Sequence, residues 1–190
     1  MVPVQAAGRG SSFVKIVVLD IEGVLVTPSC YARCRDAGWA AAADPQCVAA
    51  LNALTDATGA FLVVSSVRRL EGIMPVKETL NKWGVTGRVL DCTPRLFKDR
   101  PNELAERPRG EEIAAWIEDY PRDVAQLVIL DDDVIGGAMA PFQIQTSASA
   151  GLTQADVEKA IAKLSNVPAH RESQSRQRHV EHHGRLLTPI

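Results

Sequence analysis

Short runs of apolar, mostly branched residues recur along the chain, and each run ends in polar or turn-forming residues. The strongest runs cover residues 14–19, 60–64 and 126–130. They are short for capped helices and nearly continuous in apolar character, so they predict strands that are buried on both faces of a parallel sheet. Two weaker strands are predicted at residues 87–91 and, from the alternation of apolar and polar positions, at a sheet edge over residues 142–146.

Apolar residues at helical spacing lie between these predicted strands. Asp44-Pro45 supplies an N-cap and a first-turn proline, and an apolar stripe then runs to Gly59. The same spacing predicts three further helices, over residues 73–83, 109–117 and 153–164, and the last of these begins with Thr153 and Asp156 as a variant of the capping box. This alternation of strands and helices predicts an α/β fold with a mostly parallel central sheet and helices on both faces.

Composition and charge fit a single globular domain. The chain has 190 residues, of which 46% are hydrophobic and 23% charged, enough for one domain with a full apolar core. A formal net charge of −2 gives no overall attraction to nucleic acid or to a membrane surface. No apolar run reaches the roughly 18 residues that a membrane-spanning helix needs, so we expect a cytoplasmic protein without a membrane partner.

The periodic pattern is confined to residues 13–165, which form the predicted domain. Residues 1–12 are rich in Gly, Ser and Ala and are predicted to be a flexible lead. Residues 166–190 are rich in Arg, His, Gln and Ser and are predicted to be a disordered tail, which contains all four histidines. The four cysteines form no Cys-x-x-Cys pair and have no histidine within the domain, so we interpret them as reduced thiols, with Cys30 and Cys34 in a loop or short helix.

Polar residues stand where the three strongest strands end. They are Asp20 and Glu22 after the first strand, Ser65 and Ser66 after the second, and Asp131, Asp132 and Asp133 after the third. The carboxyl ends of parallel strands meet at one edge, where open α/β sheets hold their ligands. Three adjacent acids repel one another unless a cation offsets their charge, which favours a metal site over a solvated acidic turn.

These strand ends resemble the motifs of the haloacid dehalogenase (HAD) superfamily. Asp20-Ile21-Glu22-Gly23-Val24 is similar to its first motif, normally Asp-x-Asp-Gly-Thr or Asp-x-Asp-Gly-Val, in which the first Asp is the nucleophile. Ser65 matches the second-motif hydroxyl that binds the transferring phosphoryl group, and Asp131 and Asp132 match the fourth motif, which completes a magnesium site. The serines could equally cap the next helix.

The resemblance implies a Mg²⁺-dependent phosphohydrolase that acts through an aspartyl-phosphate on Asp20. The implied metal ligands are Asp20, Asp131, Asp132 and the backbone carbonyl of Glu22, and the implied catalytic residues are Asp20, Glu22, Ser65 and Arg109. The third-motif cation would be Arg109 or, as second choice, Lys98. Ser66, Arg68 and Lys98 are implied substrate-binding residues, although Arg68 could also lie solvated on a helix face.

The order of short motifs also suggests a substrate class. Ser-Ser-x-Arg, Thr-Pro-Arg, Arg-Gly-x-Glu-Ile, Asp-Asp-Asp and Gly-Leu-Thr follow one another as in small HAD domains without a large cap domain, some of which accompany RNA-repair modules. This similarity implies a bulky phosphate ester, such as a phosphorylated nucleic-acid end. Glu22 departs from the usual Asp, so the alternatives are a HAD-like domain that binds phosphate or a partner protein with little catalysis, and an enzyme that transfers phosphate to an acceptor other than water.

Overall fold

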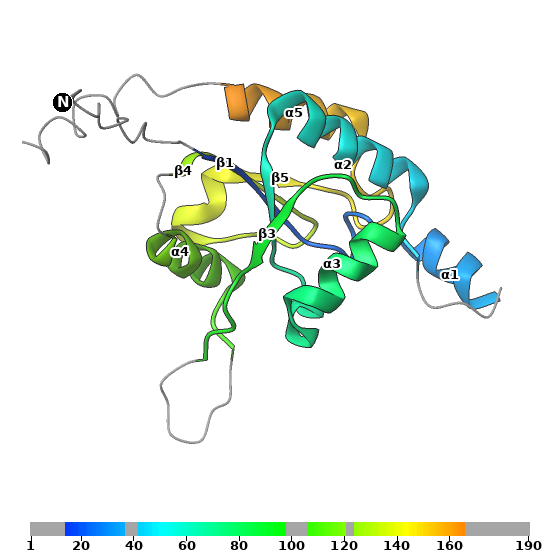
Figure 1. Cartoon of the computed structure of the whole chain (residues 1–190), viewed down its shortest axis with the longest axis horizontal. Coiled ribbons are helices and arrows are strands. Elements are labelled where there is room, and N and C mark those ends of the chain that lie inside the picture. The colour runs from blue at the N-terminus through cyan, green and yellow to red at the C-terminus, as the bar shows by residue number, and fades with distance from the viewer. Residues whose placement is uncertain (1–13, 37–41, 98–105, 121–123, 166–190) are drawn as a thin grey trace, which may run out of the picture.

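The computed structural model describes residues 14–36, 42–97, 106–120 and 124–165. The predicted lead, the predicted tail and Lys98 lie outside them. The described residues form one sheet of five strands in the order β3-β2-β1-β4-β5, and each neighbouring pair is parallel (Figure 1). The strands are β1 (Val14–Leu19), β2 (Phe61–Val64), β3 (Val89–Cys92), β4 (Val124–Asp131) and β5 (Gln143–Gln145).

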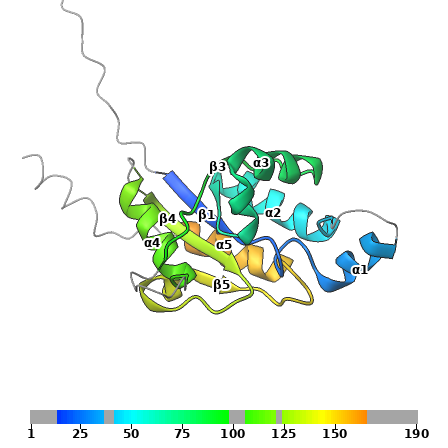
Figure 2. The same ribbon diagram turned by 90° about the horizontal axis from the view of Figure 1, so that it is seen from below.

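Helices cover both faces of this sheet (Figures 1 and 2). The α-helices are α1 (Pro28–Asp36), α2 (Pro45–Thr58), α3 (Ile73–Lys82), α4 (Arg109–Asp119) and α5 (Gln154–Ser165), and the short 3₁₀ helices are η1 (Val67–Glu71) and η2 (Gly137–Phe142). Helices α2, α3 and α5 pack on one face, while α4 and η2 pack on the other. The predicted α/β architecture is therefore confirmed.

The central strand β1 has apolar side chains on both of its faces. Val17 and Leu19 join the core beneath α2, α3 and α5, whereas Ile16 and Val18 join the core beneath α4. All four side chains are fully buried. A strand enclosed in this way is fixed in register, because a shift by one residue would exchange the two apolar sets, so β1 holds the residues that follow it firmly in place.

Local signals fix the ends of two predicted helices. Asp44 accepts a hydrogen bond from the Gln46 backbone N–H at 3.0 Å, and Gly59 ends α2 in the left-handed region with φ 67°. Before α5, the Thr153 Oγ1 accepts from the Asp156 N–H while the Asp156 carboxylate accepts from the Thr153 N–H. The two N-terminal caps predicted from the sequence are thus confirmed.

Two features refine the expected pattern. Helix α1 occupies the segment for which the sequence indicates only a loop or short helix, and it buries Cys30 and Cys34. The strand expected from residue 87 begins at Val89. All four cysteines are free thiols, and, in the described part of the chain, no helix is long and apolar enough to cross a membrane.

Candidate functional site

Backbone hydrogen bonds continue past the ends of the central strands and hold the next residues in register. The Asp20 N–H donates to the Leu130 carbonyl at 2.9 Å, and the Ser65 N–H donates to the Leu19 carbonyl at 2.9 Å. Asp131 is itself the last residue of β4. The sheet therefore brings Asp20, Ser65 and Asp131 to one edge, as expected for residues at the carboxyl ends of parallel strands.

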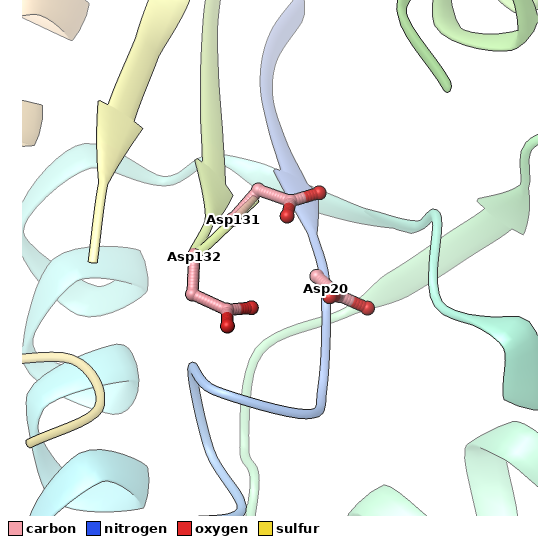
Figure 3. Close-up of side chains that lie close together, drawn as sticks. All are labelled: Asp20, Asp131 and Asp132. Atoms are coloured by element: carbon pink, nitrogen blue, oxygen red, sulfur yellow. The ribbon is translucent and has the colours of Figure 1, made fainter. Parts of the chain in front are cut away.

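Three carboxylates converge at this edge. Asp20, Asp131 and Asp132 each present an oxygen, and these atoms all lie within 4.8 Å of one another (Figure 3). Asp20 and Asp131 are buried, and Asp132 is half-buried. Hard carboxylate oxygens in such a group are the ligands that Mg²⁺ prefers, so the donor set fits this ion.

Gly23 makes room for the third carboxylate of this cluster. Its φ of 72° lies in the left-handed region, and an added Cβ would lie 2.2 Å from the Asp132 Cγ. The Gly23 carbonyl also accepts a hydrogen bond from the Thr146 hydroxyl at 2.9 Å, which ties the turn after β1 to the end of β5. Only glycine satisfies both the backbone conformation and the close approach.

Arg109 lies against two of the three carboxylates. Its Nη1 is 2.9 Å from the Asp20 Oδ2 and 2.6 Å from the Asp131 Oδ2. Arg109 is the first residue of α4. Of the two cations proposed for the third motif, Arg109 and Lys98, only Arg109 lies in the described part of the chain. Burial alone lowers the pKa of Arg109, but the adjacent carboxylates more than reverse this effect and raise its pKa above the ordinary value.

The cluster carries more negative charge than Arg109 compensates. Burial raises the pKa of the Asp20 carboxyl, although Arg109 acts in the opposite direction. Burial and the charge of Asp20 together raise the pKa of Asp131 to about 6. Asp20 and Asp131 are thus buried carboxyl groups that resist ionisation, and they lie beside Asp132. Such a cluster favours the binding of a cation.

Ser65 has a buried hydroxyl with an unused hydrogen-bonding capacity. The side chain is 0% exposed, and its Oγ has no hydrogen-bond partner among the described residues. A buried hydroxyl without a partner is costly, so such a group at a strand end is well placed to bind a ligand. The helix-capping alternative applies instead to Ser66, whose Oγ accepts from the Arg68 N–H at 3.4 Å at the start of η1.

Glu22 is held apart from the acidic cluster. One oxygen of its carboxylate accepts from the Ser66 hydroxyl at 2.7 Å, and the other accepts from the Arg68 Nε at 2.6 Å. The Arg68 guanidinium also lies over the Trp83 ring, 5.5 Å from its centroid. Ser66 and Arg68, two of the expected substrate-binding residues, thus contact Glu22. A groove of about 240 Å³ borders Glu22 and Asp132 and extends to Tyr31.

Sequence reasoning missed a buried ion pair beneath the turn that carries Ser65. Arg69 Nη1 donates to the carbonyls of Ser65 and Ser66 at 2.7 and 2.9 Å, and its Nη2 pairs with Glu112 of α4. Glu112 in turn accepts from the Leu96 N–H at 2.9 Å. The two residues are 43 positions apart. Glu112 is the glutamate of the Arg-Gly-x-Glu-Ile motif, but nothing near either residue in the sequence indicates that the two are partners.

Two glutamines of β5 are a second set of positioning residues that the sequence did not reveal. Gln143 Nε2 donates to the carbonyls of Asp131 and Asp133 at 3.2 and 2.6 Å, and Gln145 Nε2 donates to the Asp132 carbonyl at 2.9 Å. The Asp133 N–H donates to the Asp131 Oδ1 at 3.0 Å, while the side chain of Asp133 is exposed. The acidic turn is therefore held through its backbone carbonyls, and the Asp132 carboxylate takes no part in these contacts.

Comparison with known proteins agrees with this geometry. Residues 16–157 match the family described as "HAD domain in Swiss Army Knife RNA repair proteins". A search of curated proteins gave no match. The family match covers more than half of the chain and includes all the residues of the acidic cluster, Ser65 and Arg109. The chain therefore belongs to the family of HAD domains in Swiss Army Knife RNA repair proteins.

Proposed function

We propose that this domain is a Mg²⁺-dependent phosphohydrolase that acts through an aspartyl-phosphate on Asp20. The observation that carries this proposal is the meeting of a buried carboxylate cluster with the unpartnered Ser65 hydroxyl at one sheet edge. The proposed substrate is a phosphorylated nucleic-acid end, above all of RNA, or another bulky phosphate ester. The family description supports the RNA assignment, and the groove beside Glu22 supports a bulky leaving group.

Asp20, Asp131 and Asp132 would hold the metal, together with the backbone carbonyl of Glu22. When bound, Mg²⁺ neutralises phosphate oxygens so that an anionic nucleophile can approach. The fit rests on the donor chemistry, on the raised pKa values of Asp20 and Asp131, and on the space that Gly23 leaves for Asp132.

The remaining residues would act on the substrate directly. A carboxylate oxygen of Asp20 attacks phosphorus, and the bond to the leaving oxygen breaks. The Ser65 hydroxyl and the Arg109 guanidinium bind the phosphoryl oxygens, and the Glu22 carboxyl donates the proton that the leaving oxygen needs. Glu22 then takes a proton from the water that cleaves the aspartyl-phosphate, which releases phosphate and restores Asp20.

The metal site predicts a thermal response to Mg²⁺. Because the cluster exists only in the folded chain, Mg²⁺ at about 100 times its dissociation constant should stabilise the fold by about 2.7 kcal/mol. The double variant Asp131→Asn with Asp132→Asn should lose this rise in melting temperature, measured by differential scanning fluorimetry. Asp133→Asn is the matched control, because its exposed carboxylate belongs to the same acidic turn. An equal rise in the double variant would place the metal elsewhere.

Glu22 separates the hydrolase from a second candidate function. If Glu22 serves as acid and base, Glu22→Gln should reduce the Mg²⁺-dependent turnover of an aryl phosphate by about 10²–10⁴-fold. The engagement of both Glu22 oxygens by Ser66 and Arg68 favours the alternative, a domain that binds phosphate or a partner with little catalysis. In that case the parent and Glu22→Gln would be equally inert, and Glu22→Asp could restore turnover by shortening the side chain.

A further inference from the structure

Glu22 and Arg68 form a half-exposed ion pair at the mouth of the proposed site. The side chain of Arg68 is 30% exposed and that of Glu22 is 46% exposed. Among the described residues, the Arg68 guanidinium donates a hydrogen bond only through Nε, to Glu22, while Nη1 and Nη2 donate none. The guanidinium rests on Trp83, which leaves its terminal edge available to solvent and to a ligand.

We propose that Arg68 recognises a second anionic group of the substrate, separate from the phosphoryl group that Asp20 receives, and that this binding releases Glu22. The inference rests on the proposed function and specifies its substrate class: a phosphate monoester whose leaving group carries a further phosphate, such as the phosphodiester next to a phosphorylated oligonucleotide end.

Geometry places Arg68 beside the leaving group. Any leaving oxygen that Glu22 serves must approach the Glu22 carboxyl, and that carboxyl lies 2.6 Å from the Arg68 Nε. Arg68 also follows Ser65 by only three residues, across the turn that Arg69 fixes through the Ser65 and Ser66 carbonyls. A leaving group held at Glu22 is therefore next to a guanidinium with unused donors, which is well suited to bind phosphate oxygens in a bidentate manner.

The same contacts explain why occupation of Arg68 would free Glu22. A half-exposed ion pair contributes little to stability, so a phosphate anion can compete for the guanidinium. When Arg68 turns its donors to the phosphate, Glu22 loses one of the two contacts that hold it and keeps the contact with Ser66. A substrate without the second anion would leave Glu22 restrained.

The test compares three substrates in the presence of Mg²⁺. They are a 3′-phosphorylated dinucleotide, the same dinucleotide with a neutral methylphosphonate linkage, and an aryl phosphate. The parent should show a kcat/KM about tenfold higher for the charged dinucleotide than for the neutral one. Arg68→Gln should bring this ratio near one, because the neutral amide no longer distinguishes the charged linkage from the neutral one.

One control variant and two contrary outcomes complete this test. Arg88→Gln removes an exposed arginine that lies over Phe61 at 4.9 Å, and it should leave the charged-to-neutral ratio unchanged. A charged-to-neutral ratio near one in the parent would overturn the proposal. An equal loss on all three substrates in Arg68→Gln would also overturn it, because Arg68 would then contact the transferred phosphoryl group.

A binding measurement separates this inference from the hydrolase proposal. In an Asp20→Asn background, where turnover is not required, the charged dinucleotide should bind about tenfold more tightly than the neutral one, and adding Arg68→Gln should abolish the difference. If the parent shows no turnover but the charged dinucleotide still binds more tightly than the neutral one, the hydrolase proposal is refuted and the second-anion site is supported. Equal affinities for the two dinucleotides would refute the site.

Discussion

Asp20→Asn should lower the Mg²⁺-dependent hydrolysis of an aryl phosphate by more than about 10³-fold, to the level measured without protein. An amide oxygen cannot replace the carboxylate as a nucleophile, and the same change removes one member of the proposed metal site. The measurement is release of the aryl alcohol under single-turnover and steady-state conditions. Turnover that survives the substitution would exclude an aspartyl-phosphate on Asp20.

The fold should tolerate this substitution, which makes the kinetic result interpretable. Burial raises the pKa of Asp20, so its ionised form is disfavoured in the folded chain, and an uncharged amide of the same size removes that penalty. Arg109 keeps its contact with Asp131 at 2.6 Å. The melting temperature without Mg²⁺ should therefore equal or exceed that of the parent, and Asp56→Asn on the exposed surface of α2 is the matched control.

The strands that carry the site could be predicted because burial on both faces leaves an unambiguous sequence pattern. β1 is apolar at five of its six positions, and the acid that follows it marks the functional edge of the sheet. The N-terminal caps of α2 and α5 could also be predicted, because each depends on residues that are close together in the sequence. Helix α1 shows the limit of periodicity: its start at Thr27-Pro28 resembles that of α2, but its short span has no long apolar stripe.

The partners of the site residues could not be predicted, because they depend on contacts between distant segments. Nothing near Glu22 in the sequence shows that Ser66 and Arg68, more than 40 residues away, engage both of its oxygens. The choice between a ligand role and a capping role for the serines likewise needed the structure, which gives the cap to Ser66 and leaves the Ser65 hydroxyl unpartnered. Sequence motifs therefore located the edge, and tertiary packing determined which groups remain available there.

Glu112→Ala should be the most destabilising of the substitutions considered, at about 3–5 kcal/mol. Glu112 is 2% exposed, and its loss would leave the buried guanidinium of Arg69 without its carboxylate and the Leu96 N–H without its acceptor. Urea unfolding followed by circular dichroism measures the free energy of unfolding. Glu111→Ala is the matched control: the adjacent residue pairs with Arg107 at 3.6 Å on the surface, so its loss should cost less than about 1 kcal/mol.

The Arg69–Glu112 pair connects the turn that carries Ser65 to helix α4. Arg69 holds the carbonyls of Ser65 and Ser66, and Glu112 belongs to the helix that begins with Arg109. Glu112→Gln keeps an acceptor for Leu96 and a neutral partner for Arg69, so it should destabilise the fold less than Glu112→Ala does. If Glu112→Ala and Glu111→Ala lowered the unfolding free energy equally, the buried pair would not be what fixes the Ser65 turn against α4.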